Sequence, residues 1–118
     1  MAYTIKMRRY EVIAFETEPG KAPFQDWYGA IKDARAKTAI LARIDRAAAG
    51  NFGDWKPIAG VHGLCEMRIH HSQGFRVYYT VVGLKVVLLL AGSTKQEQDR
   101  TIAKAKEYLA EATRRVKQ

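Results

Sequence analysis

Hydrophobic and polar residues alternate in some stretches of the chain and follow a helical spacing in others. Residues 10–15, Tyr-Glu-Val-Ile-Ala-Phe, predict a short strand ended by a Glu-Pro-Gly turn. Within residues 23–48, apolar side chains recur every three or four positions, which predicts an amphipathic helix that begins at a proline. Gly29 or residues 33–35 can interrupt this pattern, so it fits either one long helix or a helical hairpin.

Three further apolar runs predict strands at about residues 64–70, 75–82 and 85–92. The connections between them are short and contain glycine, which favours an antiparallel meander. The third run is almost continuously apolar, as expected for a central strand covered on both faces. A Thr-Lys-Gln-Glu sequence beginning at Thr94 has the spacing of a capping box and predicts an amphipathic C-terminal helix.

These elements predict an α+β fold. A small antiparallel sheet, made of the N-terminal strand and the meander, would pack against the N-terminal helix or helical hairpin and a C-terminal helix. The length of 118 residues fits one domain, so we expect residues 1–118 to form a single unit. The only cysteine is Cys65, the longest apolar run is too short to span a bilayer, and the first residues lack a signal-peptide pattern. We therefore expect a cytoplasmic protein in a reducing compartment, with no membrane association.

The charge balance is basic, with 20 Lys and Arg against 12 Asp and Glu and a net charge of +8. Between Lys56 and Lys95 the only acidic residue is Glu66. A cationic half of this kind favours a polyanionic partner, either nucleic acid or an acidic protein. A solvated basic surface is the simpler alternative.

The hairpin predicted at residues 64–82 has one unusual face. Because side chains alternate along a strand, one face is apolar, while the other carries two guanidinium groups, an imidazole, a carboxylate and a phenol. A turn centred near Gln73 sets the register. The expected cross-strand pairs are His70 with Arg76, Arg68 with Tyr78, and Glu66 with Thr80. A one-residue shift or a bulge would bring His71 into the position of His70.

Two neighbouring arginines, Arg68 and Arg76, repel each other unless an anion lies between them. Guanidinium groups match phosphate oxygens and can stabilise the extra negative charge of a pentacoordinate phosphorane. A histidine can move a proton at neutral pH. These are the groups needed for metal-independent RNA cleavage, in which a ribose 2′-hydroxyl attacks the adjacent phosphate. The alternative is a solvated sheet face on which Glu66 pairs with one of the arginines.

Other candidate residues point less clearly to a function. His62 and Cys65 form a His-x-x-Cys pair, but the chain lacks the further ligands of a zinc site, so we expect no metal and no cofactor. Trp27, at helical spacing with other aromatic residues, is expected in the core. Trp55, in a polar stretch beside Lys56, is a candidate contact for RNA or a partner protein.

Several runs of sequence resemble the RelE/HigB superfamily of toxins from type II toxin–antitoxin modules, and in particular its phage-derived branch of addiction-module killer proteins. The resemblance is carried by LCEMRIHHSQGFRVYYTV, by KVVLLLAGSTKQEQDRTIAKA and by the upstream FQDWYGAIKDARAKTAILARIDRAAAGNFGDWKPI. It thus covers nearly the whole chain. The segments E-x-R-I, G-[FY]-R-V-Y-[YF] and L-L-L-x-G-x-x-K-x-x-Q are specific in combination, whereas any one alone is weak.

This resemblance implies a RelE/ParE-like fold and an mRNA endonuclease that acts in the ribosomal A site. It also implies inhibition by a cognate antitoxin, which we expect to be a HigA-like helix-turn-helix protein. Arg76 matches the arginine that contacts the scissile phosphate, and Arg68 matches a basic strand position that stabilises transition-state charge. Lys95 falls near the family's basic residue after the last strand, Lys56 is a candidate phosphate contact before the sheet, and Tyr78 is a further candidate for RNA binding.

The sequence departs from the family pattern at positions that matter for proton transfer. Glu66 stands where RelE itself has lysine, although glutamate is usual in the killer-protein branch. His71 stands where that branch has a tyrosine, and Gln73 replaces its proline. The general acid and base therefore remain open among His71, His70 and Glu66, in that order.

Two other functions fit a protein of this kind. A ParE-like relative would poison DNA gyrase through protein contacts and would not need the cations of the hairpin. A binding module without catalytic activity would leave both histidines without a chemical role.

Overall fold

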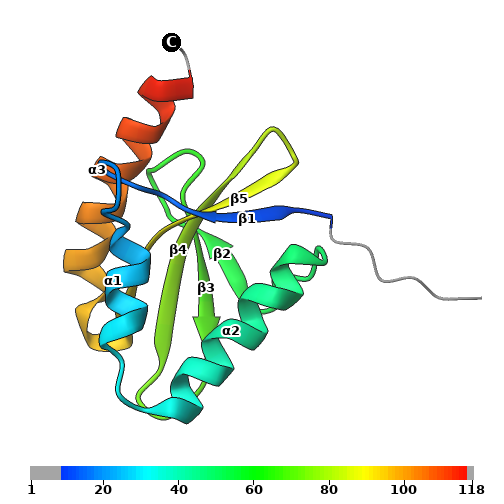
Figure 1. Cartoon of the computed structure of the whole chain (residues 1–118), viewed down its shortest axis with the longest axis vertical. Helices are drawn as coiled ribbons and strands as arrows, with labels where there is room; N and C mark the ends of the chain where they lie inside the picture. Colours follow the sequence, from blue (N-terminus) through cyan, green and yellow to red (C-terminus); the bar gives the residue numbers. More distant parts are fainter. Residues whose placement is uncertain (1–8, 117–118) are drawn as a thin grey trace, which may run out of the picture.

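The computed structural model describes residues 9–116. In this part of the chain, helices flank a five-stranded sheet with the strand order β1-β5-β4-β3-β2 (Figure 1). None of these helices is long and apolar enough to cross a lipid bilayer. The elements in chain order are β1 (Glu11–Ala14), α1 (Pro23–Ala30), α2 (Ala34–Ala48), β2 (Trp55–Pro57), β3 (Cys65–Ile69), β4 (Phe75–Val82), β5 (Val86–Thr94), the 3₁₀ turn η1 (Lys95–Glu97) and α3 (Gln98–Val116).

The predicted α+β class is confirmed, including the antiparallel meander of β3, β4 and β5 and the C-terminal helix. The N-terminal helical stretch is a helical hairpin in which α1 ends before Ile31. Asp33 has an extended conformation and caps α2, since its carboxylate accepts the backbone N–H groups of Arg35 and Ala36. An extended capping residue cannot continue a helix, so the break falls here, while Gly29 lies within α1.

The sheet differs in two ways from the expected antiparallel arrangement. β1 runs parallel to β5, with Glu11 beside Val86 and Ala14 beside Leu89, so the sheet is mixed. The long connection between these two strands allows the chain to return in the same direction. In addition, β2 lies in a stretch expected to be a loop and pairs with β3. Its sequence, Trp-Lys-Pro, has no apolar alternation from which a strand would be predicted.

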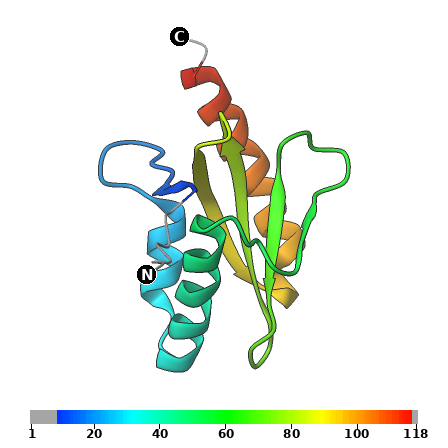
Figure 2. The same cartoon turned by 90° about the vertical axis from the view of Figure 1, so that its right-hand side faces the viewer.

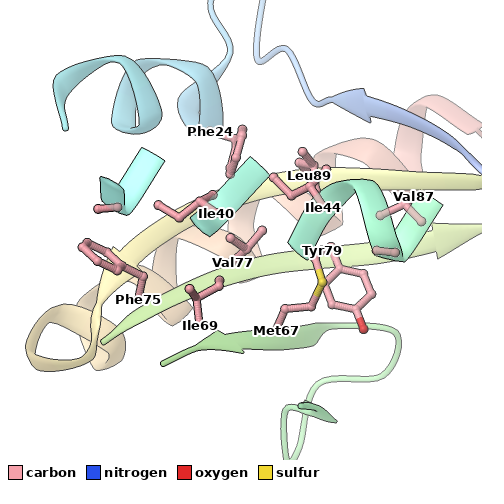
Figure 3. Packing of buried hydrophobic residues seen from close by; sticks show 12 residues of the cluster. Phe24, Ile40, Ile44, Met67, Ile69, Phe75, Val77, Tyr79, Val87 and Leu89 are labelled. Atoms are coloured by element: carbon pink, nitrogen blue, oxygen red, sulfur yellow. The ribbon is translucent and has the colours of Figure 1, made fainter. Parts of the chain in front are cut away.

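Helices cover both faces of the sheet, with α1 and α2 on one face and α3 on the other (Figure 2). β5 contributes Leu89 to the first core and Leu90 to the second, as its nearly continuous apolar sequence predicts. The first core contains Phe24, Ala36, Ile40, Ile44, Ala47, Met67, Ile69, Phe75, Val77, Tyr79, Val87 and Leu89 (Figure 3). The second contains Phe15, Leu64, Tyr78, Leu90, Ala91, Ala105 and Ala112.

The face of the hairpin that carries the polar side chains is therefore also partly covered by a helix. The alternation itself is as predicted, because Met67 and Val77 belong to the first core, while Glu66 and Arg76 are on the face toward α3. However, α3 packs against β4 and β5 there and buries Tyr78 completely. The polar side chains of the hairpin thus lie at the border of a second core, where their charges are only partly solvated.

The expected register of the hairpin is also wrong, because the centre of the turn lies one residue earlier in the chain than predicted. Arg68 lies opposite Arg76, and Glu66 lies opposite Tyr78. The connection between β3 and β4 contains five residues, of which Ser72 has a φ of 53° and Gly74 a φ of 86°. These left-handed residues centre the loop at Ser72 instead of Gln73, and the pattern of apolar residues carries no signal for that choice.

Candidate functional site

The two arginines of the hairpin face each other directly across β3 and β4. Side chains paired in this way have Cβ atoms about 5 Å apart, at which distance like charges destabilise a sheet. Arg76 is only 6 % exposed. Its Nη1 donates to the carbonyl oxygen of Phe75 at 3.3 Å, but its Nε has no hydrogen-bond partner among the described residues. Burying a guanidinium without a carboxylate is costly, so an anionic ligand would be strongly favoured beside it.

Arg68 differs from Arg76 because it has a carboxylate partner. Glu66 is 2 % exposed, and its Oε1 accepts from Nε of Arg68 at 3.0 Å. The same oxygen lies 3.8 Å from Nζ of Lys56, which comes from the neighbouring strand β2. One buried carboxylate therefore holds two cations in place, and among the described residues it forms no ion pair with Arg76.

Next to the arginines in the sheet, Tyr78 and Ser93 form a buried hydroxyl pair at 3.1 Å. Burial raises the pKa of Tyr78, and the Ser93 hydroxyl opposes that shift. The phenol thus stays protonated. Because Ser93 lies directly opposite Arg76 in the register of β4 and β5, this pair lies beside Arg76 on the same face of the sheet. Tyr78 has no exposed surface in this arrangement, so the structure assigns it a supporting position.

A shallow depression of about 330 Å³ opens beside Arg76 at the end of the hairpin. Its lining contains one imidazole, one guanidinium and one ammonium group, together with the polar loop between β3 and β4. The amide N–H of Lys95 donates to the carbonyl oxygen of Gly74 at 3.1 Å, and this bond ties the loop to the end of β5. The lining residues are His70, Ser72, Gln73, Gly74, Arg76 and Lys95.

The two histidines of the loop point to different parts of the molecule. Nε2 of His70 lies 2.5 Å from Oδ2 of Asp54, and the carbonyl oxygen of Asp54 accepts the N–H of Arg68 at 2.8 Å. His71 instead lies 3.7 Å from the carboxylate of Asp33, the cap of α2. His70 lines the depression and His71 does not. Of the two, only His70 therefore lies at the depression.

Both carboxylates beside the histidines have lowered pKa values. The hydrogen bond with His70 is the largest cause for Asp54, and the backbone N–H of Ala36 is the largest cause for Asp33. Both acids thus stay ionised over the neutral range, and each can orient its histidine. With Nε2 held by Asp54, Nδ1 of His70 is the nitrogen left for other partners.

A larger hollow of about 520 Å³ lies elsewhere, between α2 and β1. Aliphatic side chains such as Val12, Leu41 and Ile44 make up most of its lining, and no arginine, lysine or histidine lines it. Size alone favours this hollow, but the charged groups needed for phosphate chemistry lie around the smaller one. We therefore take the depression beside Arg76 as the candidate site.

Comparison with known proteins identifies the family. A model of the family described as "Phage derived protein Gp49-like (DUF891)" matches residues 31–117. The chain belongs to this Gp49-like family. A relative from Haemophilus influenzae, described as an uncharacterized protein, is 43% identical over 83 residues, which cover 70% of this chain and 82% of the relative. The Gp49-like family is associated with addiction-module killer toxins, and the matched region contains the whole candidate site.

Two residues of the Gp49-like site were not found from the sequence. Asp54 reaches His70 only because the short strand β2 pairs with β3, and that pairing left no pattern in the sequence. Ser93 reaches Tyr78 through the register of β4 and β5. A polar residue within an otherwise apolar strand was the only available signal for Ser93.

The remaining candidates have simpler surroundings. Lys56, on β2, and Lys95, directly after β5, are both exposed, as phosphate contacts would have to be. With Arg68 and Arg76 between them in the sheet order, they form a row of cations. Cys65 is half-buried on the face toward α1 and α2, and burial raises the pKa of its thiol. Within residues 9–116, no three His, Cys, Asp or Glu side chains are grouped to hold a metal ion.

Proposed function

We propose that this Gp49-like protein is the toxin of a type II toxin–antitoxin module and acts as a ribosome-dependent mRNA interferase. The reaction would be metal-independent. The ribose 2′-hydroxyl would lose its proton to water, its oxygen would bond to the adjacent phosphorus, and the 5′-oxygen would leave with a proton, which gives a 2′,3′-cyclic phosphate and a 5′-hydroxyl. The family's association with killer toxins supports the first part. The chemistry of the depression beside Arg76 supports the second.

The observation that carries the proposal is the isolated charge of Arg76. The side chain is almost buried, faces a second arginine and has an unpaired Nε. A structural arginine in such a place would have a carboxylate partner, and the nearby Glu66 is already shared by Arg68 and Lys56. A phosphate group in the depression would supply the missing anion and make bidentate contacts with the guanidinium.

The other residues fit roles around that phosphate. Arg68, oriented by Glu66, would stabilise the charge that grows on the equatorial oxygens of the transition state. Lys56 and Lys95 would contact phosphates on either side. Because Arg68 and Lys56 already share the carboxylate of Glu66, we assign Glu66 mainly to their orientation.

Protonation of the departing 5′-oxygen would fall to His70. In the form protonated on both nitrogens, the imidazole donates through Nε2 to Asp54 and can give its Nδ1 proton to the departing 5′-oxygen. Loss of that proton leaves a neutral ring that still donates to Asp54. His71 is a less direct candidate, because it contacts Asp33 and not the depression.

The test is mRNA cleavage mapping by primer extension in a cell-free translation reaction. We compare the wild type with Arg76→Ala, and we use Arg114→Ala as the matched control. Arg114 is an exposed arginine on α3 that pairs with Glu111, away from the depression. Removing one transition-state donor lowers the rate by about 10²- to 10³-fold. We expect ribosome-dependent cuts within codons from the wild type and the control, and their loss in Arg76→Ala.

Two results would contradict the proposal. Full cleavage by folded Arg76→Ala would remove Arg76 from the reaction. Intact mRNA with wild-type protein, combined with inhibition of DNA supercoiling, would favour a gyrase poison instead. The proposal also includes a cognate antitoxin, which we expect to be a HigA-like helix-turn-helix protein whose addition stops cleavage.

A further inference from the structure

Trp55 is a large aromatic side chain in an exposed position. It lies on β2, the edge strand of the sheet, and 47 % of it is exposed. Its ring packs edge-on against Phe52, with the ring centroids 6.4 Å apart. Phe52 in turn stacks on the buried ring of Tyr79 at 5.4 Å with an angle of 9° between the planes. The core thus fixes one side of the indole, while about half of the side chain remains open to solvent.

Cations lie on both sides of the edge strand that carries this tryptophan. The guanidinium of Arg43 donates to the carbonyl oxygens of Phe52 and, at 3.4 Å, of Arg68. It lies so close to the backbone that a Cβ atom at Gly53 would be 1.8 Å from its Nη1. Lys56 follows Trp55 in the same strand and is exposed. Asp54, the acidic residue directly before Trp55, is hydrogen-bonded to His70.

Trp55 is also continuous with the candidate site. Its partner across β2 and β3 is Met67, the residue before Arg68. Two strand spacings of about 4.8 Å separate β2 from β4, the strand of Arg76, which is about 10 Å in total. At the duplex spacing of about 3.4 Å per nucleotide, this distance corresponds to about three nucleotides. An RNA strand with one phosphate at Arg76 therefore needs only a few further nucleotides to extend as far as β2.

Neighbouring residues on a strand point to opposite faces, so Lys56 lies on the side of α3 and Trp55 on the side of α2. An RNA strand that reaches this edge can leave a phosphate on Lys56 and turn the attached base around β2. Unpaired RNA bases are commonly bound in this way, splayed out and stacked on an aromatic ring next to cations.

We propose that Trp55 is a stacking subsite for one unpaired nucleobase of the RNA whose scissile phosphate binds at Arg76. The inference rests on the proposed function and names a binding subsite for its substrate. A partner protein would also be attracted by an exposed tryptophan. RNA is favoured because Arg43 lies on the same side of the sheet as the ring, and because Lys56 and Arg68, on the other face, lead from the edge strand β2 toward the depression.

The experiment uses the full-length protein and a short single-stranded RNA in which every ribose carries a 2′-O-methyl group, so that cleavage cannot occur. Binding is followed by anisotropy of a labelled RNA and by tryptophan fluorescence. The variants are Trp55→Leu, which removes the ring, and Trp55→Phe, which keeps an aromatic face. Trp27 provides the background signal in both variants, because it packs inside against Phe24 and Phe75. Inorganic polyphosphate is the matched ligand, with the same charges and no bases.

We expect RNA to quench the fluorescence of the wild type and to leave that of Trp55→Leu nearly unchanged. Affinity for RNA should fall on the order of 10- to 100-fold in Trp55→Leu, which corresponds to the loss of one stacked base, and should stay within a few-fold in Trp55→Phe. Polyphosphate should bind the wild type and Trp55→Leu equally well.

Several outcomes would overturn the inference. RNA binding that is equal in all variants, or an absence of binding to the wild type, excludes a stacking subsite. An equal loss of polyphosphate binding in Trp55→Leu would mean that the ring acts only through the neighbouring cations. Loss of antitoxin binding with unchanged RNA binding would assign the ring to a protein contact. Cleavage mapping distinguishes a failure of this inference from a failure of the proposed function. Cleavage without stacking on Trp55 would contradict only the inference, and stacking without cleavage would contradict only the proposed function.

Discussion

Replacing Arg76 with methionine should make the protein more stable and at the same time inactive. Methionine keeps the volume of the alkyl stem and removes the buried charge. Leaving a buried donor unsatisfied costs about 1–3 kcal/mol, and replacing buried ionic groups with apolar ones of similar volume is often stabilising by about 1–4 kcal/mol. The wild type has an unpaired Nε at this position and a second arginine opposite.

The loss of the Nη1 bond to Phe75 offsets part of this gain, by about 1 kcal/mol. We therefore expect a net stabilisation of about 1–2 kcal/mol. For 118 residues, an unfolding entropy of about 2.1 cal/mol/K per residue converts each kcal/mol into about 4 °C. The melting temperature should rise by about 4–8 °C, whereas cleavage should fall by about 10²- to 10³-fold.

Thermal unfolding in the absence and presence of inorganic phosphate provides the assay. A ligand at ten times its dissociation constant stabilises the native state by about 1.4 kcal/mol, or about 6 °C here. Phosphate should therefore raise the melting temperature of the wild type and have little effect on Arg76→Met. A variant that is less stable than the wild type, and a wild type that phosphate does not stabilise, would together refute the idea that Arg76 is held for an anion.

Three further predictions concern the surroundings of Arg76. Arg68→Met should lower the free energy of unfolding by about 1–3 kcal/mol, measured by denaturant unfolding, because it leaves the buried Glu66 with only the more distant Lys56 as a partner. A gain in stability would contradict the pairing of Arg68 with Glu66. Tyr78→Phe should cost about 1 kcal/mol in the same assay, because the buried hydroxyl of Ser93 loses its partner, and Ser93→Ala with Tyr78→Phe should cost less than the sum of the single changes. Asp54 has a lowered pKa in the folded state, so its contribution to stability is present above the ordinary value of 3.8 and is lost as the pH falls through the lowered pKa. The decline of the melting temperature between about pH 5 and pH 2 should accordingly be shallower in Asp54→Asn than in the wild type, and identical profiles would mean that the contact with His70 is absent in solution.

The parts of the fold that were predicted correctly depend on local pattern. The two faces of the hairpin follow from alternation, so Arg76 and Tyr78 were assigned to one face and Val77 to the other. The break between α1 and α2 was left open between Gly29 and residues 33–35, and it lies at Asp33, whose side chain favours a helix cap over a helix interior. Both signals depend on residues close together in the chain.

The parts that were missed depend on how distant segments meet. The register of the hairpin is set by left-handed backbone at Ser72 and Gly74, and Asp54 reaches His70 through the pairing of β2 with β3. The cover that α3 provides over Tyr78 is likewise a matter of packing. Residue types alone could therefore suggest phosphate chemistry, but they could not distinguish the two histidines.

The corrected register changes the chemical argument. With the expected register, Arg76 would have faced His70, and Arg68 would have faced Tyr78. With the observed one, the two guanidinium groups face each other, and Glu66 neutralises only Arg68. Such an arrangement opposes folding unless something else favours it, because like charges are brought together at the border of a core. A phosphate bound by both guanidinium groups would offset their repulsion. The lower stability of the unliganded protein would then be a consequence of binding that phosphate.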